Sequence, residues 1–312
     1  MKSLIAVLAA FALLAPAASA TGRGGGFAAP LAQREALTHG IAGDEEHVFV
    51  TEPGIGVSTA GPRVVVLDRR SGREQAVLPP PPGGFKLPFT LRVARTGHLV
   101  VLDSGGFPPQ GPPVVYDYAY SDRHGFKAVL ERRVDFAGLP LGFAEDVEVL
   151  PNGEYVVSES VFGGLWLIGR DGRIRPGLVP SDPTRPLPNI GPCSFPGDGT
   201  GMVGDLPFAA GGNFAPGAGS LAVHDDDLYA GDPFRLQLIR IDSRTGRREV
   251  LSTDQRLFDF TTATAFLPPE HPWLRNPLVT ASDQEYRWAT LNVALTADQF
   301  RPPFTVAQFW PR

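Results

Sequence analysis

The chain has 312 residues, with 36 Gly, 32 Pro, one Cys and a formal net charge of −5. The acidic balance argues against nucleic acid and against an anionic membrane surface as partners. Because Cys193 is the single cysteine, no internal disulfide can form, and stability has to come from an apolar core and the chain topology.

The first twenty residues, MKSLIAVLAAFALLAPAASA, combine one Lys, a short apolar stretch broken by Pro16, and an Ala18-Ser19-Ala20 motif. This pattern predicts a signal peptide over residues 1–20 that is cleaved after Ala20. We therefore expect a secreted or periplasmic protein with no membrane anchor after cleavage. Residues 21–34 begin with TGRGGGFAAP and are expected to form a flexible lead-in.

Short strand patterns then recur through residues 35–312. The clearest unit covers 144–179, where DVEVL, EYVVSES, LWLI and RIRPGLV are separated by PNG, GG and RDG turns. Alternating polar and apolar residues between such turns indicate antiparallel strands joined by hairpins. Four strands in a repeated unit of this length are typical of one blade of a β-propeller.

Five such units are visible, beginning near Glu35, Phe89, Ala144, Ser220 and Thr261. The expected fold is all-β, a propeller of six blades with four antiparallel strands each, with five blades as the alternative count. Pro and Gly are frequent in 180–218, which is expected to be a long irregular insertion. It would be a lid over the channel mouth, a plain insertion that projects away from it, or part of a degenerate blade. The segment FTVAQFW near the C-terminus is a candidate for closing the ring with an N-terminal strand.

The starts of the innermost strands are the expected place for a site, because they face the channel of a propeller. Aligning the units puts Thr90, Asp146 and Ser220 in equivalent positions, with Glu145 one residue before Asp146. Glu35 is the nearest candidate in the first unit. Glu35, Glu145 and Asp146 would supply the hard oxygen ligands that Ca²⁺ prefers, and Ser220 would add a neutral hydroxyl. The alternative for each residue is a solvated loop position.

A second pattern is an acid at the end of the second strand of each unit. These acids are Glu52, Asp103, Glu159, Asp232 and Asp283. Together they would form an oxygen-rich ring around one rim of the channel. Alternatively, each carboxylate accepts backbone N–H groups in the loop that follows its strand.

Other catalytic patterns are weak. The six His residues show no zinc-binding spacing, and no G-x-S-x-G motif occurs. His39, His124 and His224 remain candidate general bases, each with a structural alternative.

The segments EDVEVLPNGEYVVSES with GGLWLI, and AGSLAVHDDDLYAGDPFRLQLIRIDSRTGR, resemble blades of the SMP-30/gluconolactonase-like and strictosidine-synthase-like propeller superfamily. Enzymes of that group hold one Ca²⁺ at the channel mouth and hydrolyse lactones or phosphotriesters. The resemblance implies Glu35 as the first-blade ligand, and Glu145 and Asp146 as the next ligand position. The chain departs from the family pattern at Gly219-Ser220, where the family has Asp-Gly or Asn-Gly.

The expected function is Ca²⁺-dependent hydrolysis of a lactone or related ester at the channel mouth, with a small molecule as substrate. Asp146 and Glu145 are the candidate catalytic residues, and Asp146 or a nearby acid would assist the attacking water. The main alternative is a non-catalytic propeller that binds a small molecule or a protein through the same face. A lyase or synthase that relies on a His is a third possibility.

Overall fold

The computed structural model describes residues 19–20, 27–54, 60–106, 110–139, 141, 144–150, 152–159, 165–176, 200–203, 206–209, 221–224, 227–232, 237–242, 248–252, 261–268, 278–282 and 304–310. These residues form strands β1 to β23 and contain no helix. Accordingly, none of these described segments is a helix that could cross a membrane.

Six antiparallel sheets contain all of these strands. Blade 1 consists of β3 (Ile41–Gly43), β4 (His47–Glu52), β5 (Arg63–Asp68) and β6 (Glu74–Val77). Blade 2 consists of β7 (Pro88–Arg95), β8 (His98–Asp103), β9 (Val114–Ser121) and β10 (Lys127–Asp135). Blade 3 consists of β11 (Ala144–Val149), β12 (Tyr155–Glu159), β13 (Leu165–Ile168) and β14 (Ile174–Pro176).

The remaining strands complete the set. In place of a fourth four-stranded blade, the described residues form a two-stranded sheet of β15 (Thr200–Val203) and β16 (Leu206–Ala209). Blade 5 consists of β17 (Leu221–His224), β18 (Asp227–Asp232), β19 (Gln237–Asp242) and β20 (Arg248–Ser252). Blade 6 consists of β1 (Ser19–Ala20), β2 (Phe27–Arg34), β23 (Phe304–Trp310), β22 (Leu278–Ser282) and β21 (Thr261–Phe266).

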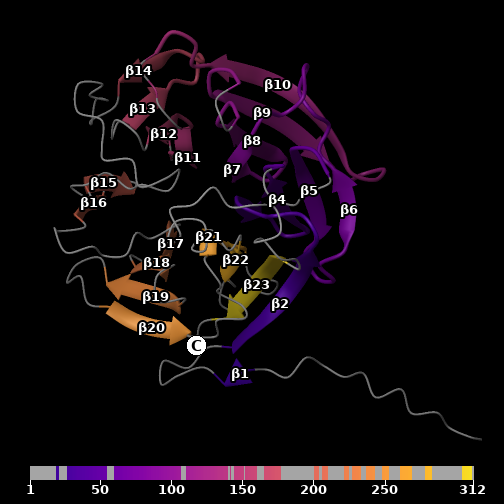
Figure 1. Ribbon diagram of the computed structural model, residues 1–312, viewed down its shortest axis with the longest axis vertical. Coiled ribbons are helices and arrows are strands. Elements are labelled where there is room, and N and C mark those ends of the chain that lie inside the picture. Colours follow the sequence, from indigo (N-terminus) through magenta and orange to yellow (C-terminus); the bar gives the residue numbers. More distant parts are fainter. Residues whose placement is uncertain are drawn as a thin grey trace, which may run out of the picture.

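The sheets are arranged around a common centre, as Figure 1 shows. Their innermost strands contact one another in the order β17, β21, β3, β7 and β11. The protein is therefore a β-propeller, as the repeated units predicted. The two-stranded sheet lies between blades 3 and 5 in Figure 1 and belongs to the segment 180–218 that we expected to be an irregular insertion.

The ring is closed by pairing the two ends of the chain. Strand β2 pairs antiparallel with β23, from Phe27 opposite Trp310 to Arg34 opposite Phe304. This confirms the predicted role of FTVAQFW. Most of the expected flexible lead-in is therefore a strand, because β2 satisfies the exposed edge of β23. Pro30 is tolerated in β2 because the register shifts between Pro30 and Ala32, and a bulge does not need the missing N–H.

The core lies between the blades rather than within them. One cluster joins blades 1 and 2 through residues such as Phe49, Leu91 and Tyr118, and another joins blades 2 and 3 through Val100 and Val147. Two further clusters join blade 6 to blades 1 and 5. A central strand such as β4 is buried along its whole length, because both of its faces meet a neighbouring blade. The outer strand β10 alternates between exposed and half-buried residues.

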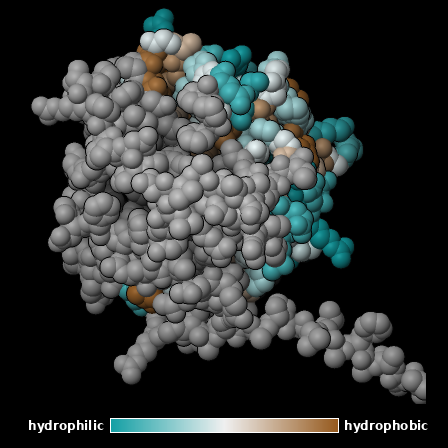
Figure 2. Space-filling view, viewed as in Figure 1, coloured by the Kyte–Doolittle hydropathy of each residue, from teal (hydrophilic) through white to brown (hydrophobic). Residues whose placement is uncertain are grey.

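On the face that Figure 2 shows, hydrophilic and hydrophobic residues lie side by side in the described part of the chain. They include teal residues along the rim formed by blades 1 and 2. Three large apolar residues are exposed in the described chain, on the outer strands of three different blades: Val77, Val129 and Val250.

Three of the innermost strands, β7, β11 and β21, share one irregularity near their first residues. The pairing register shifts between Pro88 and Thr90, between Ala144 and Asp146, and between Thr261 and Ala263. Each shift places one extra residue in the inner strand, namely Phe89, Glu145 and Thr262. Such bulges redirect neighbouring side chains and are frequent beside functional sites.

Candidate functional site

Two neighbouring inner strands, β7 and β11, bring four polar side chains together. Alternation along β7 sends Leu91 into the apolar core, so Thr90 and Arg92 project from the opposite face. Likewise, Val147 of β11 enters the core between blades 2 and 3, and Asp146 and Glu148 project from the other face. We call Thr90, Arg92, Asp146 and Glu148 the axial cluster.

Arg92 lies at the centre of the axial cluster. Its Nη2 donates to Asp146 Oδ2 at 2.8 Å, and its Nε donates to Glu148 Oε2 at 3.0 Å. Its Nη1 donates to Thr90 Oγ1 at 3.2 Å and to the Leu91 carbonyl oxygen at 2.9 Å. Thr90 Oγ1 donates in turn to Asp146 Oδ1 at 2.8 Å. Four hydrogen bonds to protein groups therefore hold the guanidinium in one orientation.

The carboxylates of the cluster are more exposed to solvent than Arg92. The side chains of Asp146 and Glu148 are 42% and 47% exposed, against 13% for Arg92. Burial among surrounding protein atoms nevertheless raises the pKa of Asp146; Arg92 opposes this shift and Glu148 adds to it. Burial acts to lower the pKa of Arg92, but Asp146 and Glu148 together raise it. Asp146 is thus a solvent-reachable carboxyl with an elevated pKa beside a permanent positive charge.

The predicted equivalence of Thr90 and Asp146 is confirmed. Thr90 pairs with Leu102 and Asp146 pairs with Ser158, in each case one residue before the acid that ends the second strand. In blade 1 the corresponding position is Gly40, whose carbonyl accepts the N–H of Thr51.

The other predicted site residues are placed differently. Glu35 is exposed and directly follows the outer strand β2; no hydrogen bond or ion pair joins it to the axial cluster in the described chain. Glu145 is the extra residue of the bulge in β11, and its side chain lies outside the described residues, as does Ser220. Of the proposed ligands, the structure therefore brings only Asp146 into a described polar site.

The described part of this site does not fit a Ca²⁺ ion centred on Asp146. Both oxygens of Asp146 accept hydrogen bonds, and Asp146 Oδ1 also accepts the Val147 N–H at 2.8 Å. Arg92 already supplies the positive charge, and a guanidinium this close to Oδ2 would repel a second cation. Calcium at this place would need Arg92 to move away.

Sequence reasoning missed Arg92 and Glu148. The available signal was alternation, since Thr90-x-Arg92 and Asp146-x-Glu148 each put two polar residues on one face of a strand. That their faces meet depends on the packing of β7 against β11.

The described rim acids have structural partners. Asp103 is buried and accepts the backbone N–H groups of Lys86, Leu87 and Gly105 at 2.7, 2.8 and 3.0 Å. Glu52 is fully buried and accepts Arg34 Nε at 2.8 Å and Arg63 Nε at 2.6 Å. The backbone alternative therefore holds in part for Asp103, through Gly105 in the loop after β8, whereas Glu52 is paired with arginine side chains. The side chains of Glu159 and Asp232, and all of Asp283, lie outside the described residues.

Among the histidines, His39 lies at the start of the inner strand of blade 1. Its ring stacks on Phe89 with centroids 3.6 Å apart, and its Nδ1 is 3.0 Å from the Phe89 carbonyl oxygen. Burial lowers the pKa of His39 to about 3. The ring is therefore neutral near pH 7, and Nδ1 carries the proton that the carbonyl accepts.

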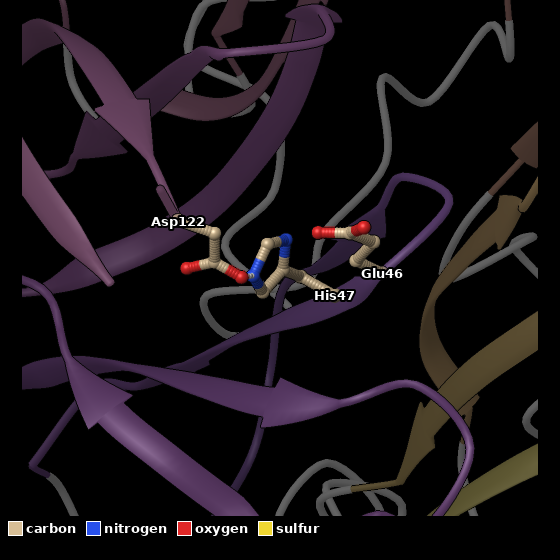
Figure 3. A group of neighbouring side chains, drawn as sticks. All are labelled: Glu46, His47 and Asp122. Carbon is tan, nitrogen blue, oxygen red and sulfur yellow. Dashed lines mark hydrogen bonds and ion pairs between the residues drawn. The ribbon is translucent and has the colours of Figure 1, made fainter. Parts of the chain in front are cut away.

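A second group of ionisable side chains lies at the opposite ends of these blades' strands. Glu46, His47 and Asp122 offer ligand atoms within 4.8 Å of one another. Figure 3 shows the His47 ring standing between the two carboxyl groups, with Asp122 on one side and Glu46 on the other. Both ring nitrogens already lie within hydrogen-bond distance of a carboxylate, Nδ1 near that of Asp44 and Nε2 near that of Asp122, so neither nitrogen is left for a metal ion.

No protein-family model matches the sequence, and no curated protein matches it. Solved propeller structures are similar in fold. The chain is 12% identical to a gluconolactonase from Xanthomonas campestris, with a TM-score of 0.57, covering 93% of this chain and 91% of the other. A glucose dehydrogenase gives 12% identity and a TM-score of 0.53, covering 90% and 98%. The virginiamycin B lyase from Staphylococcus aureus gives 12% identity and a TM-score of 0.51, covering 91% and 98%.

These similarities extend over almost the whole chain, so the class of protein is an all-β propeller with one ring. At such low identity these similarities establish the fold alone. A function has to be argued from the side chains of this chain, such as those of the axial cluster.

Proposed function

We propose that this protein is an exported propeller enzyme that hydrolyses a lactone or related ester at the axial cluster, with Asp146 as the general base. The observation that carries the proposal is a solvent-reachable carboxyl, Asp146, with an elevated pKa and an orienting arginine beside it. A perturbed ionisable pair at the centre of a propeller is a reasonable candidate for a catalytic site. The similar folds of a gluconolactonase and a lyase support an enzymatic role.

In the proposed reaction, Asp146 removes a proton from a water molecule while the water oxygen attacks the ester carbonyl carbon. The bond between that carbon and the ring oxygen then breaks. The proton returns from Asp146 to the departing oxygen, and the product is a hydroxy acid. A carboxylate whose pKa is raised is a stronger base than an ordinary aspartate, which favours the first proton transfer.

The neighbours of Asp146 have complementary roles. Thr90 holds Asp146 Oδ1 and Arg92 holds Asp146 Oδ2, so the carboxylate is oriented from both sides. The positive charge of Arg92 stabilises the oxyanion that forms on the attacked carbonyl oxygen.

A Ca²⁺ ion, as the family resemblance implies, would add Lewis acidity toward the carbonyl. Such an ion would take Glu35, Glu145, Asp146 and Ser220 as ligands, and Arg92 would have to leave Asp146. The chemistry derived above uses the described side chains alone.

A second candidate function is ligand binding without catalysis. The observation that favours it is that Arg92 already donates to Glu148, Thr90, Leu91 and Asp146, so these bonds leave one of its five N–H groups for an oxyanion. Such a network holds the solvent-reachable carboxylates of two adjacent blades in fixed orientations, which suits binding of a ligand better than stabilisation of an oxyanion.

The deciding experiment uses the mature chain, residues 21–312, against a panel of lactones and aryl esters. The assay is run with added Ca²⁺ and again with a chelator. Asp146→Asn keeps the side-chain shape and removes the base, so we expect kcat to fall about 100-fold or more. Glu131→Gln on the outer strand β10 is the control and should leave kcat unchanged.

The outcomes separate the possibilities. Hydrolysis that survives chelation and is lost in Asp146→Asn supports the proposal. Hydrolysis that chelation abolishes would instead place a metal in the reaction. If no ester is hydrolysed under either condition while a panel compound binds saturably, the non-catalytic function replaces the enzymatic one.

A further inference from the structure

At the junction of blades 1 and 2, a buried histidine bridges carboxylates from both blades. His47 begins β4, and its side chain is only 3% exposed. Its Nδ1 lies 3.1 Å from Asp44 Oδ1, within blade 1, and its Nε2 lies 2.8 Å from Asp122 Oδ2, in the turn between β9 and β10 of blade 2. Only a ring with protons on both nitrogens donates to both carboxylates.

The two carboxylates are held very differently. Asp44 also accepts the backbone N–H groups of Glu46 and His47, at 2.8 and 2.7 Å, and the Tyr120 hydroxyl at 2.5 Å. Asp122 is 32% exposed, and its other oxygen, Oδ1, is buried without a hydrogen-bond partner. Asp44 therefore keeps its orientation without the His47 ring, whereas the orientation of the Asp122 carboxylate depends on its hydrogen bond to His47.

Charged and titratable groups approach His47 from the turns of blades 1 and 2, from β9 and from β5, whose Asp68 lies opposite His47 in register. Asp44 and Glu46 come from the turn between β3 and β4, Tyr120 from β9, and Asp122 from the turn after β9. Arg69, in the turn after β5, donates to the Asp44 carbonyl oxygen at 3.0 Å and so supports the same turn. Arg123 and His124 follow Asp122 and are exposed. The edges of Tyr120 and Phe126 flank the imidazole.

We propose that His47 is a proton-operated latch between blades 1 and 2, which holds the turn at Asp122 while the ring carries two protons and releases that turn when one proton is lost. A neutral ring keeps a single N–H. If that proton stays on Nδ1, the bond to the fixed Asp44 survives, and the lone pair of Nε2 faces Asp122. Asp122 then turns to solvent, because it is the partner that is free to move.

The direction of the pH effect follows from the surroundings. Burial acts to lower the pKa of His47, but Asp44 and then Asp122 raise it above the ordinary value. The latch is therefore closed below this elevated pKa and opens as the pH rises through it. Asp44 itself stays ionised, since His47 and Tyr120 hold its pKa at about 2 despite burial.

The test is amide hydrogen exchange of residues 121–127 in the mature protein, at pH 6 and pH 9, corrected for intrinsic exchange. The N–H of Gly125, which donates to the Asp122 carbonyl at 3.1 Å, is a suitable reporter. Loss of a charged hydrogen bond predicts exchange that is about tenfold or more faster at pH 9 than at pH 6. His47→Gln should abolish this difference. His98→Gln, which lies in blade 2 like the reporter turn, should keep it.

A second variant guards against misfolding of His47→Gln. Asp122→Ala leaves Asp44 and His47 intact, and its turn should exchange at pH 6 as fast as the wild-type turn does at pH 9. NMR titration of the His47 ring should then show a midpoint shifted to lower pH. Equal protection of the wild-type turn at both pH values, or a His47 midpoint unaffected by Asp122→Ala, would overturn the proposal.

Discussion

Thr90 Oγ1 lies 2.8 Å from Asp146 Oδ1, although the two residues are 56 positions apart in the chain. Each occupies the same register position on the inner strand of its blade. The repeat thus does more than build a ring, because equivalent positions of consecutive blades meet at the centre and form a polar site.

Arg92 should be essential for the order of this site. Replacing it with Met removes the donors to Asp146 and Glu148 and leaves their carboxylates side by side. We expect a loss of about 1 to 3 kcal/mol in the free energy of unfolding, measured by urea denaturation. The pKa of Asp146 should rise further, which moves the acidic limb of any pH–rate profile to higher pH. Arg95→Met on the exposed end of the same strand should change neither quantity.

Glu52 should anchor the closing strand. It is buried between Arg34, which comes from β2 of blade 6, and Arg63 of blade 1. Glu52→Gln leaves both guanidinium groups without their buried carboxylate, so we expect a loss of about 3 to 5 kcal/mol in unfolding free energy. Glu74 also pairs with Arg34 but is 37% exposed, and Glu74→Gln should cost about 1 kcal/mol or less. Similar losses for both variants would contradict this assignment.

Gly40 should be needed because the chain just before β3 lies very close to the backbone of β7, which leaves no room for a side chain. A Cβ at this position would lie 2.6 Å from Thr90 Cα and 2.7 Å from the Phe89 carbonyl oxygen, both backbone atoms. Gly40→Ala therefore forces blades 1 and 2 apart, with an expected loss of about 1 to 3 kcal/mol. At Gly111 an added Cβ meets nothing within 4 Å, so Gly111→Ala should leave the thermal midpoint unchanged. An unchanged unfolding free energy in Gly40→Ala would show that blades 1 and 2 can move apart without cost.

His39 should make the protein sensitive to acid. Burial holds its folded pKa at about 3, whereas the unfolded chain takes up a proton near pH 6.5. This contribution to stability is present above pH 6.5 and is lost as the pH falls toward 3. The wild-type protein should lose up to about 1.4 kcal/mol per pH unit relative to His39→Gln below pH 6.5. Because His47 has the opposite pH dependence, the comparison must use the difference between wild type and variant.

The N-terminal strand should be needed for a closed ring. A chain that starts at Thr21 keeps β2 and should fold like the full chain, with an unchanged thermal midpoint. A chain that starts at Glu35 loses β2 and also Arg34, which exposes the edge of β23. We expect this shorter chain to aggregate in size-exclusion chromatography. A monomeric, cooperatively melting product would show that β2 is dispensable.

The sequence was informative where the physical rule is local. Alternation and turn residues located the four strands of 144–179, which match β11 to β14, and the apolar FTVAQFW was correctly expected to close the ring. The residues 21–34 were harder to interpret, since Gly and Pro suggested flexibility while β2 forms through a distant partner. Hydrogen bonds between the two ends of a chain leave no local signal.

The candidate site was only partly predictable for the same reason. Repeat alignment identified Asp146 and Thr90, because equivalent residues of a repeat occupy equivalent places. It gave no indication that Arg92 fills the space beside Asp146, where a metal ion had been expected. Likewise, His47 and Asp122 are 75 positions apart and belong to different blades. By itself the sequence determined the strands, the repeat and the class of fold, whereas the packing of one blade against the next decided which charges meet, because a charge finds its partner through space and not along the chain.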